Sequence, residues 1–152
     1  MGKRVIVVGG GMQTALKLSA GGVSALLLER DADLGGKLTG WHKLFPSFTP
    51  AHEVLDELRR RLAASDVEVR ARCEVAEVAR DGVTLSTGER LEADAVVVAT
   101  GFTLFDARIK EEYGYGIYDN VYTTVDIERM LNEGRVALKD GTAPRRIAFL
   151  HC

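Results

Sequence analysis

The N-terminal part of the chain carries a pattern that few folds can accommodate. Val5–Val8 is an uninterrupted apolar run, and Gly9–Gly11 follows it directly. A second apolar run, Ala25–Leu28, ends at Glu29. Apolar runs without polar alternation are typical of strands that are covered on both faces, as in a parallel sheet. Residues Thr14–Ala20 favour a helix, so the pattern predicts two buried strands joined by a right-handed crossover.

The next segment predicts a second helix and a third strand. Thr49 is a suitable N-cap, and Pro50 suits the first helical position because its missing N–H costs nothing there. The helix is expected to end near Ser65, and Val67–Val69 is expected to form a short strand. The apolar face of this helix consists of Ala51, Leu55, Leu58 and Leu62.

Residues 72–99 change character. Glu74–Val78 and Val83–Leu85 alternate between apolar and polar residues, and Asp81–Gly82 and Thr87–Gly88 are turn sequences. This pattern predicts a small antiparallel meander that leads into a further buried strand, Ala95–Ala99. The predicted fold class is therefore α/β, with a Rossmann-like parallel sheet, crossover helices and a small antiparallel β-meander.

The C-terminal part predicts little sheet. All four tyrosines fall between Tyr113 and Tyr122, and a helix is expected after Thr123–Thr124, with Gly134 at its end. Its inward residues are expected to be Ile127, Met130 and Leu131. We expect residues 1–106 to form the first domain and 107–144 a Tyr-rich insert and linker. Residues 145–152 are expected to begin a second domain with the strand Ile147–Leu150, as the N-terminal portion of a longer protein.

The charge and the apolar content of the chain argue against two kinds of partner, nucleic acids and membranes. The chain of 152 residues has 20 Lys and Arg against 22 Asp and Glu, for a net charge of -2. Binding of nucleic acid needs a clustered basic excess, so we expect no nucleic-acid partner. No apolar run approaches the roughly 20 residues of a membrane span, and the N-terminus lacks a signal-peptide core. We therefore expect no membrane partner and a cytoplasmic location.

Other kinds of site have little support in the sequence. Two cysteines, Cys73 and Cys152, are too few for a disulfide framework or a four-cysteine metal site, so no metal site is predicted. No nucleophile–base–acid arrangement is evident, and catalytic residues stay unassigned. His42 follows the second glycine pair, and both a surface role and a catalytic role remain open for it.

The first glycine segment suits a diphosphate. Gly9, Gly10 and Gly11 allow the backbone to approach a pyrophosphate at the positive end of the following helix. Glu29 can then accept hydrogen bonds from a ribose diol, with Arg30 beside it, and this acid argues against the 2′-phosphate of NADP. Thr14 stands where a third glycine would allow close packing, so we expect it to push the helix away from the first strand.

Two later segments extend this candidate site. Gly35 and Gly36 let the chain pass close to the phosphates, and Lys37 can add a positive charge. A Cβ at Gly36 is expected to crowd the phosphates or to force an unfavourable backbone angle. Thr100 and Gly101 end a buried strand, where a cofactor can pass closely. Val75, at the start of the meander, is also predicted to contact the cofactor.

In this order, the motifs resemble the two-dinucleotide-binding flavoproteins of the thioredoxin reductase and glutathione reductase group. The later residues resemble more narrowly the A-subunit family of the heterodisulfide reductases. The segments that carry this narrower resemblance are Phe105–Arg108, Lys110–Gly116, Asn120–Val121, and Arg146–Phe149 with Cys152. The glycine loop differs from the family pattern, in which about three further residues precede the helix.

The resemblance implies non-covalently bound FAD in a protein that relays electrons between a soluble donor and iron–sulfur or disulfide partners. The chain is then expected to be part of an FAD-dependent oxidoreductase, with other redox subunits, iron–sulfur proteins, as partners of the full-length protein. Two alternatives remain open. One is a fragment of an NAD(P)H-dependent enzyme similar to thioredoxin reductase. The other is a non-catalytic remnant or partner-binding module whose short glycine loop impairs flavin binding.

Overall fold

The computed structural model describes residues 2–151. They divide into two compact units, each interrupted in sequence. The first unit contains the residues up to Thr39 together with His52–Phe102, and the second contains Gly40–Ala51 together with the residues from Thr103 on. The domains predicted from the sequence are consecutive segments, whereas Gly40–Ala51 here groups with the C-terminal part of the chain.

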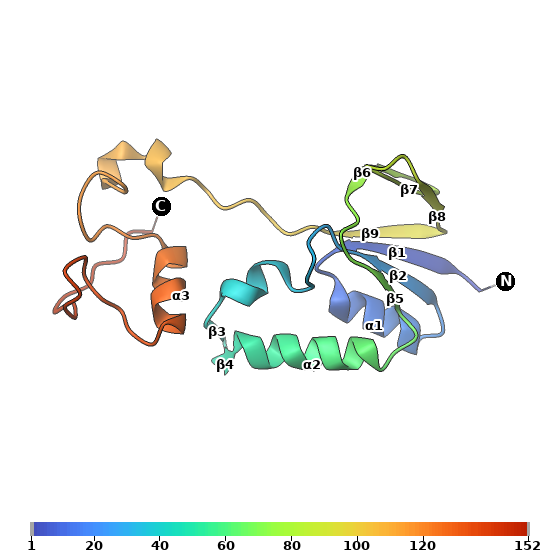
Figure 1. Ribbon diagram of the computed structural model, residues 1–152, viewed down its shortest axis with the longest axis horizontal. Helices are drawn as coiled ribbons and strands as arrows, with labels where there is room; N and C mark the ends of the chain where they lie inside the picture. Colours follow the sequence, from blue (N-terminus) through green and yellow to red (C-terminus); the bar gives the residue numbers. More distant parts are fainter. Residues whose placement is uncertain (1, 152) are drawn as a thin grey trace. The chain divides into compact units, whose positions relative to one another are not determined.

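A four-stranded parallel sheet forms the centre of the first unit (Figure 1). Its strand order is β5-β2-β1-β9, and every neighbouring pair is parallel. The strands are β1 (Arg4–Gly9), β2 (Ser24–Leu28), β5 (Glu68–Arg70) and β9 (Ala95–Ala99). Helix α1 (Met12–Ala20) connects β1 to β2, which confirms the predicted crossover unit. Strand β5 begins one residue later than predicted.

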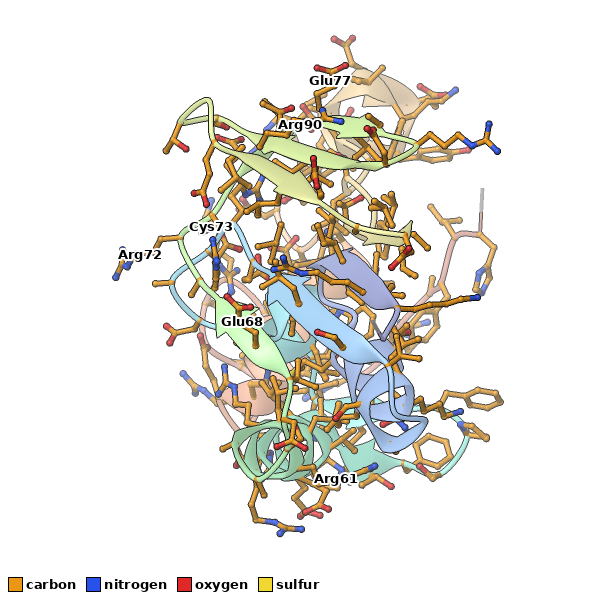
Figure 2. All side chains as sticks on the ribbon, turned by 90° about the vertical axis from the view of Figure 1, so that its right-hand side faces the viewer. Arg61, Glu68, Arg72, Cys73, Glu77 and Arg90 are labelled. Carbon is orange, nitrogen blue, oxygen red and sulfur yellow. The ribbon has the colours of Figure 1, made fainter. Side chains whose placement is uncertain are left out.

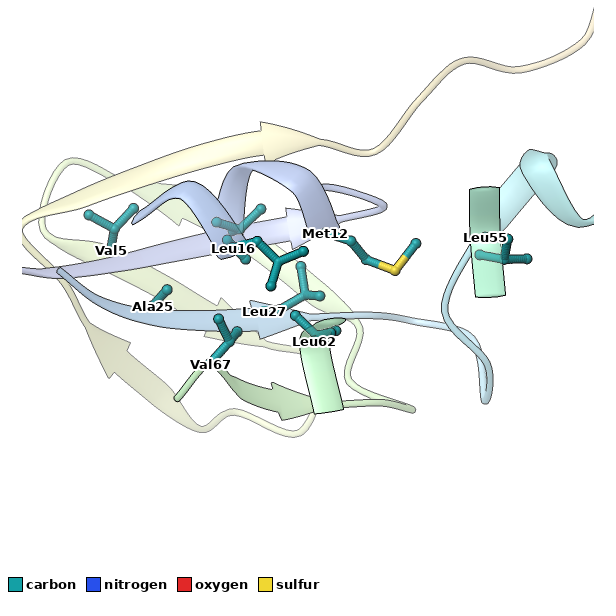
Figure 3. Close-up of a cluster of buried hydrophobic side chains, with 10 residues drawn as sticks. Val5, Met12, Leu16, Ala25, Leu27, Leu55, Leu62 and Val67 are labelled. Carbon is teal, nitrogen blue, oxygen red and sulfur yellow. The ribbon is translucent and has the colours of Figure 1, made fainter. Parts of the chain in front are cut away.

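One face of this sheet is covered by helices. Val5 and Val7 of β1 point to this face and pack with Met12 and Leu16 of α1 (Figure 3). Helix α2 (Ala51–Ala63) contributes further buried side chains to the same cluster, and its predicted apolar face is confirmed. The contributing residues are Leu55 and Leu62, with Leu58 partly buried beside them.

The opposite face is covered by an antiparallel sheet of β6 (Val75–Ala79), β7 (Gly82–Leu85) and β8 (Arg90–Glu92). The intervening residues of β1, Ile6 and Val8, pack here against side chains of this small sheet. Those side chains are Val83, Leu85 and Leu91. The predicted meander is thus confirmed, and it supplies the second cover that a strand without polar alternation requires.

Strand β9 is less buried than its sequence predicts. It lies at the edge of the sheet, paired only with β1 among the described residues. Val96 and Val97 are half-buried, and Val98 is 60% exposed. The prediction of a buried strand was wrong because an apolar run does not distinguish an edge strand from a central one.

The start of α2 also differs from the prediction. Thr49 and Pro50 do not cap the helix; they form β4 (Thr49–Pro50), which pairs antiparallel with β3 (Lys43–Leu44). The helix begins at Ala51, whose N–H donates to the carbonyl of His42 at 3.0 Å. The Ala51 N–H, which a Thr49 cap was expected to pair, is thus bonded to a backbone carbonyl instead.

The second unit contains two 3-10 turns, η2 (Ala107–Ile109) and η3 (Glu111–Tyr113), and helix α3 (Thr124–Asn132). Gly134 follows α3 with φ +86°, and the next N–H bonds back to Met130, so the predicted end of the helix is confirmed. The predicted inward residues of α3 are only half-buried.

Ile147–Leu150 was predicted to be the first strand of a second domain; it forms no strand among the described residues, and its place in such a domain stays a prediction. The segment pairs with no other strand, and its apolar side chains are exposed, Phe149 by 71%. A parallel strand needs a neighbour to bond its backbone groups, and an apolar run alone does not supply one. Cys152 lies outside the described residues.

Hydrogen bonds at the start of α3 lower the pKa of Asp126. Burial alone would raise this pKa, but the Thr123 hydroxyl and the Thr123 N–H both donate to the carboxylate, at 2.7 and 2.9 Å. The Asp126 N–H donates in return to the Thr123 hydroxyl, which completes a capping box.

We expect acid to open this capping box. A carboxyl with a lowered folded-state pKa stabilises the fold above its unfolded pKa of about 3.9, and this stabilisation is lost as the pH falls through the folded pKa. The chemical shift of the Thr123 amide should therefore titrate with a midpoint below the ordinary aspartate pKa of about 3.9. In Asp126→Asn this titration should be absent; an unchanged titration would mean that another group controls it.

A matched pair of valines tests whether the antiparallel sheet is part of the core. Val83 is fully buried, whereas its register partner Val78 is 48% exposed. We expect Val83→Ala to lower the free energy of unfolding by about 1.5–3 kcal/mol, because it removes buried methyl groups and leaves a cavity. Val78→Ala should change it by less than about 0.5 kcal/mol. Equal losses in urea titrations would contradict the assignment.

Candidate functional site

Three of the predicted segments meet where the parallel strands end, at their carboxyl-terminal ends. We call this place the sheet edge from here on. Gly9 ends β1 opposite Ala99, the last residue of β9, and Val8 lies opposite Leu28, the last residue of β2. Glu29 therefore follows the neighbouring strand at the same edge. From β1 the chain continues to one side through β2 and β5, whereas β9 lies on the other side. In open α/β sheets, ligands bind where the strand order reverses in this way.

The first glycine segment leaves little room for side chains. Gly9 has φ +88°, and a Cβ there would lie 2.7 Å from the Ala99 carbonyl oxygen. A Cβ at Gly11 would collide with Val7 and would lie 3.2 Å from the Ala99 Cβ. Gly10 is less constrained; its N–H donates to the Ala99 carbonyl at 3.1 Å. Gly9 and Gly11 are thus the two positions that require bare backbone.

The contact at Gly11 changes the expectation for Thr14. Helix α1 begins directly after Gly11, and Gly11 itself lies against Val7 of β1, so the chain already comes close to the strand there. Thr14 is half-buried, and the helix packs on the sheet through Met12, Ala15 and Leu16. Thr14 therefore does not prevent packing, because in this shorter loop Gly11 does what a third glycine was expected to do.

Free hydrogen-bond donors lie at the N-terminus of α1. The first bond of the helix runs from the Ala15 N–H to the Gly11 carbonyl at 3.0 Å, and no side chain caps the helix. The N–H groups of Met12, Gln13 and Thr14 have no acceptor in the described part of the chain. Such donors, at the positive end of the helix dipole, suit the oxygens of a diphosphate.

Glu29 is the buried acid of the site, with 6% of its surface exposed. Its Oε1 accepts a hydrogen bond from the Asp31 N–H at 3.1 Å, and no donor among the described residues reaches Oε2. Its backbone N–H and carbonyl bond to Arg70 and Cys73, at 2.9 and 2.8 Å. The carboxylate is thus held in place with one oxygen available to a ribose diol.

Figure 2 shows the connection between β5 and β6 that carries this contact. Arg72 points away from it and has φ +57°, and its N–H donates to the Asp31 carbonyl at 3.0 Å. Cys73, a free and half-buried thiol, packs beside the core cluster under the antiparallel sheet. This connection holds the backbone on both sides of Arg30.

The second glycine pair lies against α2. Gly35 has φ +131°, and a Cβ there would lie 2.8 Å from the Leu55 Cδ1. The preceding carbonyl, of Leu34, accepts hydrogen bonds from the Arg59 guanidinium. Gly36 has φ +50° and begins a 3-10 turn, η1 (Gly36–Gly40); a Cβ on Gly36 would meet no described protein atom within 4 Å. Gly36 therefore leaves open space for a ligand. Gly35 allows the chain to turn where no space for a side chain exists beside Leu55.

Lys37 reaches the edge of the sheet from this turn. Its Nζ lies 3.8 Å from the place where a Cβ on Gly101 would stand and 4.6 Å from the centroid of the Phe102 ring. Gly101 has φ +75°, which turns the chain after Thr100. The structure thus brings Lys37 to Gly101, as the candidate site requires. Phe102 was not predicted; as one exposed aromatic residue, it gave no sequence signal.

Two predicted residues do not lie in the edge itself. The Arg30 side chain is exposed, and its Nε lies 3.6 Å from the Asp31 carboxylate. Val75 is half-buried in β6 opposite Leu85. Their contacts with a cofactor stay a prediction.

Other predicted features have local partners. His42 belongs to the second unit, where its N–H donates to the Glu128 carboxylate at 2.6 Å and its Nδ1 lies 3.2 Å from the Asn132 side-chain oxygen. These bonds join the hairpin to α3. Within residues 2–151, no group of three or more His, Cys, Asp or Glu residues could hold a metal ion.

The residues at the sheet edge fit a dinucleotide. They provide backbone close to the ligand at Gly9, open N–H donors at α1, and a fixed carboxylate at Glu29. Lys37 adds a positive charge that has no ion-pair partner in the described part of the chain. None of the described helices has the length and apolar character to span a membrane.

Comparison with known proteins identifies relatives of the chain. The family model for pyridine nucleotide-disulphide oxidoreductases matches residues 1–129. The iron–sulfur A subunit 1 of the CoB–CoM heterodisulfide reductase of Methanopyrus kandleri is 52% identical over 69 residues, which cover 41% of this chain and 10% of that protein. The A subunit of the ferredoxin:CoB–CoM heterodisulfide reductase of Methanosarcina mazei is 48% identical over 67 residues, which cover 40% of this chain and 8% of that protein.

The chain thus spans about a tenth of the length of these curated relatives. Solved structures share its fold. The tetrameric 2-methyl-3-hydroxypyridine-5-carboxylic acid oxygenase has a TM-score of 0.54 at 22% identity, with 66% of this chain and 40% of that chain covered. The Diels–Alderase of pyrroindomycin biosynthesis has a TM-score of 0.51 at 22% identity, with 65% and 32% covered.

These matches confirm the predicted fold class and the resemblance to the heterodisulfide reductase A subunits. The family match also confirms that the chain carries a pyridine nucleotide-disulphide oxidoreductase module, the kind of module inferred from the motifs.

The glycine pair allows a matched test of the local backbone. We expect Gly35→Ala to lower the free energy of unfolding by about 1–3 kcal/mol, because its φ excludes side chains and its Cβ would press on Leu55. Gly36→Ala should cost about 1 kcal/mol, since only its left-handed backbone opposes a side chain. Thermal unfolding without ligand would measure both, and a larger loss at Gly36 would contradict this account.

Proposed function

Because the chain belongs to the pyridine nucleotide-disulphide oxidoreductase family, we propose that it is the FAD-binding part of an electron-transfer protein similar to the A subunit of heterodisulfide reductase. The observation that carries the proposal is the meeting of the glycine segments, Glu29 and Lys37 at one edge of the sheet. The chain's own share of the work is to bind and orient the cofactor.

Each part of the edge has a proposed role. The N–H groups after Gly11 bind the pyrophosphate, and the free Oε2 of Glu29 accepts from the adenosine ribose. Gly35 and Gly36 let the chain pass beside the phosphates, and Lys37 neutralises part of their charge. The remaining proposed contacts are Gly9, Gly10, Arg30, Val75, Thr100 and Gly101.

Bound FAD would supply the chemistry, since a flavin takes up and releases electrons that no protein side chain here can carry. The protein determines where the cofactor lies and how exposed it is to water. We therefore propose no catalytic residue in this chain. Electron donor and acceptor belong to the rest of the protein and to its partners.

We propose that the second unit carries the surface that binds a partner. Its exposed apolar side chains include Phe105, Ile109, Ile117 and Tyr118, each 59–70% exposed. Exposed apolar side chains of this number are typical of surfaces that bind other proteins. We propose that the partner is another redox subunit that carries iron–sulfur clusters, in keeping with the names of the relatives, which describe subunits of heterodisulfide reductases.

Flavin content distinguishes this proposal from a non-catalytic partner-binding module. The purified chain, reconstituted with FAD and freed of excess cofactor, should show flavin absorbance in a fixed ratio to protein. A folded chain that retains no flavin at high micromolar FAD would favour the second function, because the donors at the short glycine loop would then not serve a cofactor.

The proposed role of Glu29 predicts a selective loss of affinity. Glu29→Ala should weaken FAD binding by about 1.5–3 kcal/mol, or about ten- to over a hundred-fold, because the charged acceptor for the ribose is lost. Glu53→Ala, at an exposed position of α2, should bind like the parent chain. Fluorescence titration with FAD measures both. Equal affinities would remove Glu29 from the site.

A further inference from the structure

Lys37 is held by an unusual neighbour for a charged side chain. Its ammonium lies 4.6 Å from the centroid of the Phe102 ring, within the range of a cation–π contact. No carboxylate forms an ion pair with Lys37 in the part of the chain that the structure describes. The aromatic face is therefore the only charge-stabilising partner that this ammonium has among those residues.

The backbone explains how the ring reaches this place. Strand β9 ends at Ala99 beside Gly9, and Gly101, with φ +75°, turns the chain before Phe102. The Phe102 ring is 58% exposed, so it is not packed in the core. The Lys37 side chain passes Gly101 on its way to the Phe102 ring. Its Nζ lies 3.8 Å from the place where a Cβ on Gly101 would stand. A side chain at Gly101 would occupy space beside the ammonium.

Flexible lysines lose rotamer freedom when they bind an anion, and a contact that restricts them beforehand reduces this loss. An aromatic face suits this task because it attracts the ammonium without neutralising it, whereas a carboxylate would compete with the ligand. The charge that Phe102 holds thus remains available to phosphate oxygens at the same sheet edge.

We propose that Phe102 is a positioning residue, which holds the Lys37 ammonium beside Gly101 so that it meets the pyrophosphate of the cofactor. This inference rests on the proposed function for the identity of the ligand. It adds a residue outside the glycine motifs and assigns a reason to its exposed ring. Phe102 acts through Lys37 and needs no contact with the cofactor.

The contact itself is tested in the cofactor-free chain. The ring current of Phe102 should shift the Lys37 ε-methylene proton resonances upfield, and Phe102→Leu should return them to the ordinary lysine position. Phe102→Tyr should keep the shift because it keeps an aromatic face. Resonances at the ordinary position in the parent chain would overturn the proposal.

The positioning role is tested by titration with FAD and, separately, with inorganic pyrophosphate. Phe102→Leu should weaken both by about two- to five-fold, with a smaller dependence on salt, whereas Phe102→Tyr should restore both affinity and salt dependence. In Lys37→Met the further change Phe102→Leu should have no effect, since the ring acts through the lysine. Phe149→Leu, at another exposed phenylalanine, controls for loss of apolar surface.

The outcomes separate the two claims. If the parent chain and Phe102→Leu bind FAD with equal affinity and equal salt dependence, Phe102 has no positioning role, and the proposed function stands. If the parent chain binds pyrophosphate in a Phe102-dependent manner but does not bind FAD, the positioning role stands and the proposed function fails. A Phe102→Leu effect of the same size in the Lys37→Met background would overturn the positioning role.

Discussion

The contact between the end of β1 and the end of β9 determines much of this structure. Gly9 lies against the Ala99 carbonyl, and the following N–H of Gly10 bonds to the same oxygen. This approach is close enough to exclude any Cβ at Gly9. Because the glycine loop, the start of α1 and the turn at Gly101 all begin from this pair of strand ends, their positions depend on it. A backbone contact between residues far apart in sequence thus forms the base of the candidate site.

Burial of β1 on both faces supports that contact. Alternate side chains of one short strand enter two separate clusters, one beneath the helices and one beneath the antiparallel sheet. Removing either cover would expose half of the strand, which would weaken the pairing that carries the loops. The antiparallel meander therefore has two structural roles. It completes the core, and the connection that leads to it from β5 holds the backbone around Glu29.

The sequence predicts much of the first unit because local signals and burial agree there. Apolar runs, turn sequences and helical periodicity each indicate the same elements in residues 4–99. The errors have physical causes. Pro50 suits a helix start, but it pairs instead in the hairpin with Lys43–Leu44. Val98 and Phe149 look like core residues because hydrophobicity does not report whether a neighbouring strand exists. A third glycine was expected to be needed at position 14 for close packing. Gly11 provides that close contact instead, because the helix starts directly after it.

Within the site, residue types were predictable and their partners were not. The glycines and Glu29 could be chosen from spacing, since phosphates and ribose demand those chemical groups at strand ends. The cation–π contact of Lys37 depends on a turn at Gly101 that brings distant segments together, and no pattern in either segment indicates the other. The same holds for the bond between the Cys73 N–H and the Glu29 carbonyl.

That last bond has a consequence for how the chain responds to its ligand. The main chain of Glu29 is hydrogen-bonded to Arg70, at the end of β5, and to Cys73, within the β5–β6 connection, so opening of that connection releases the acid. A ligand that binds only the closed arrangement suppresses the opening by mass action, by about 2.7 kcal/mol at one hundred times its dissociation constant. Amide hydrogens near Cys73 would then exchange more slowly when the site is filled, although they belong to a layer of the fold that the cofactor need not touch. Binding of a ligand at the sheet edge therefore changes how often the β5–β6 connection opens.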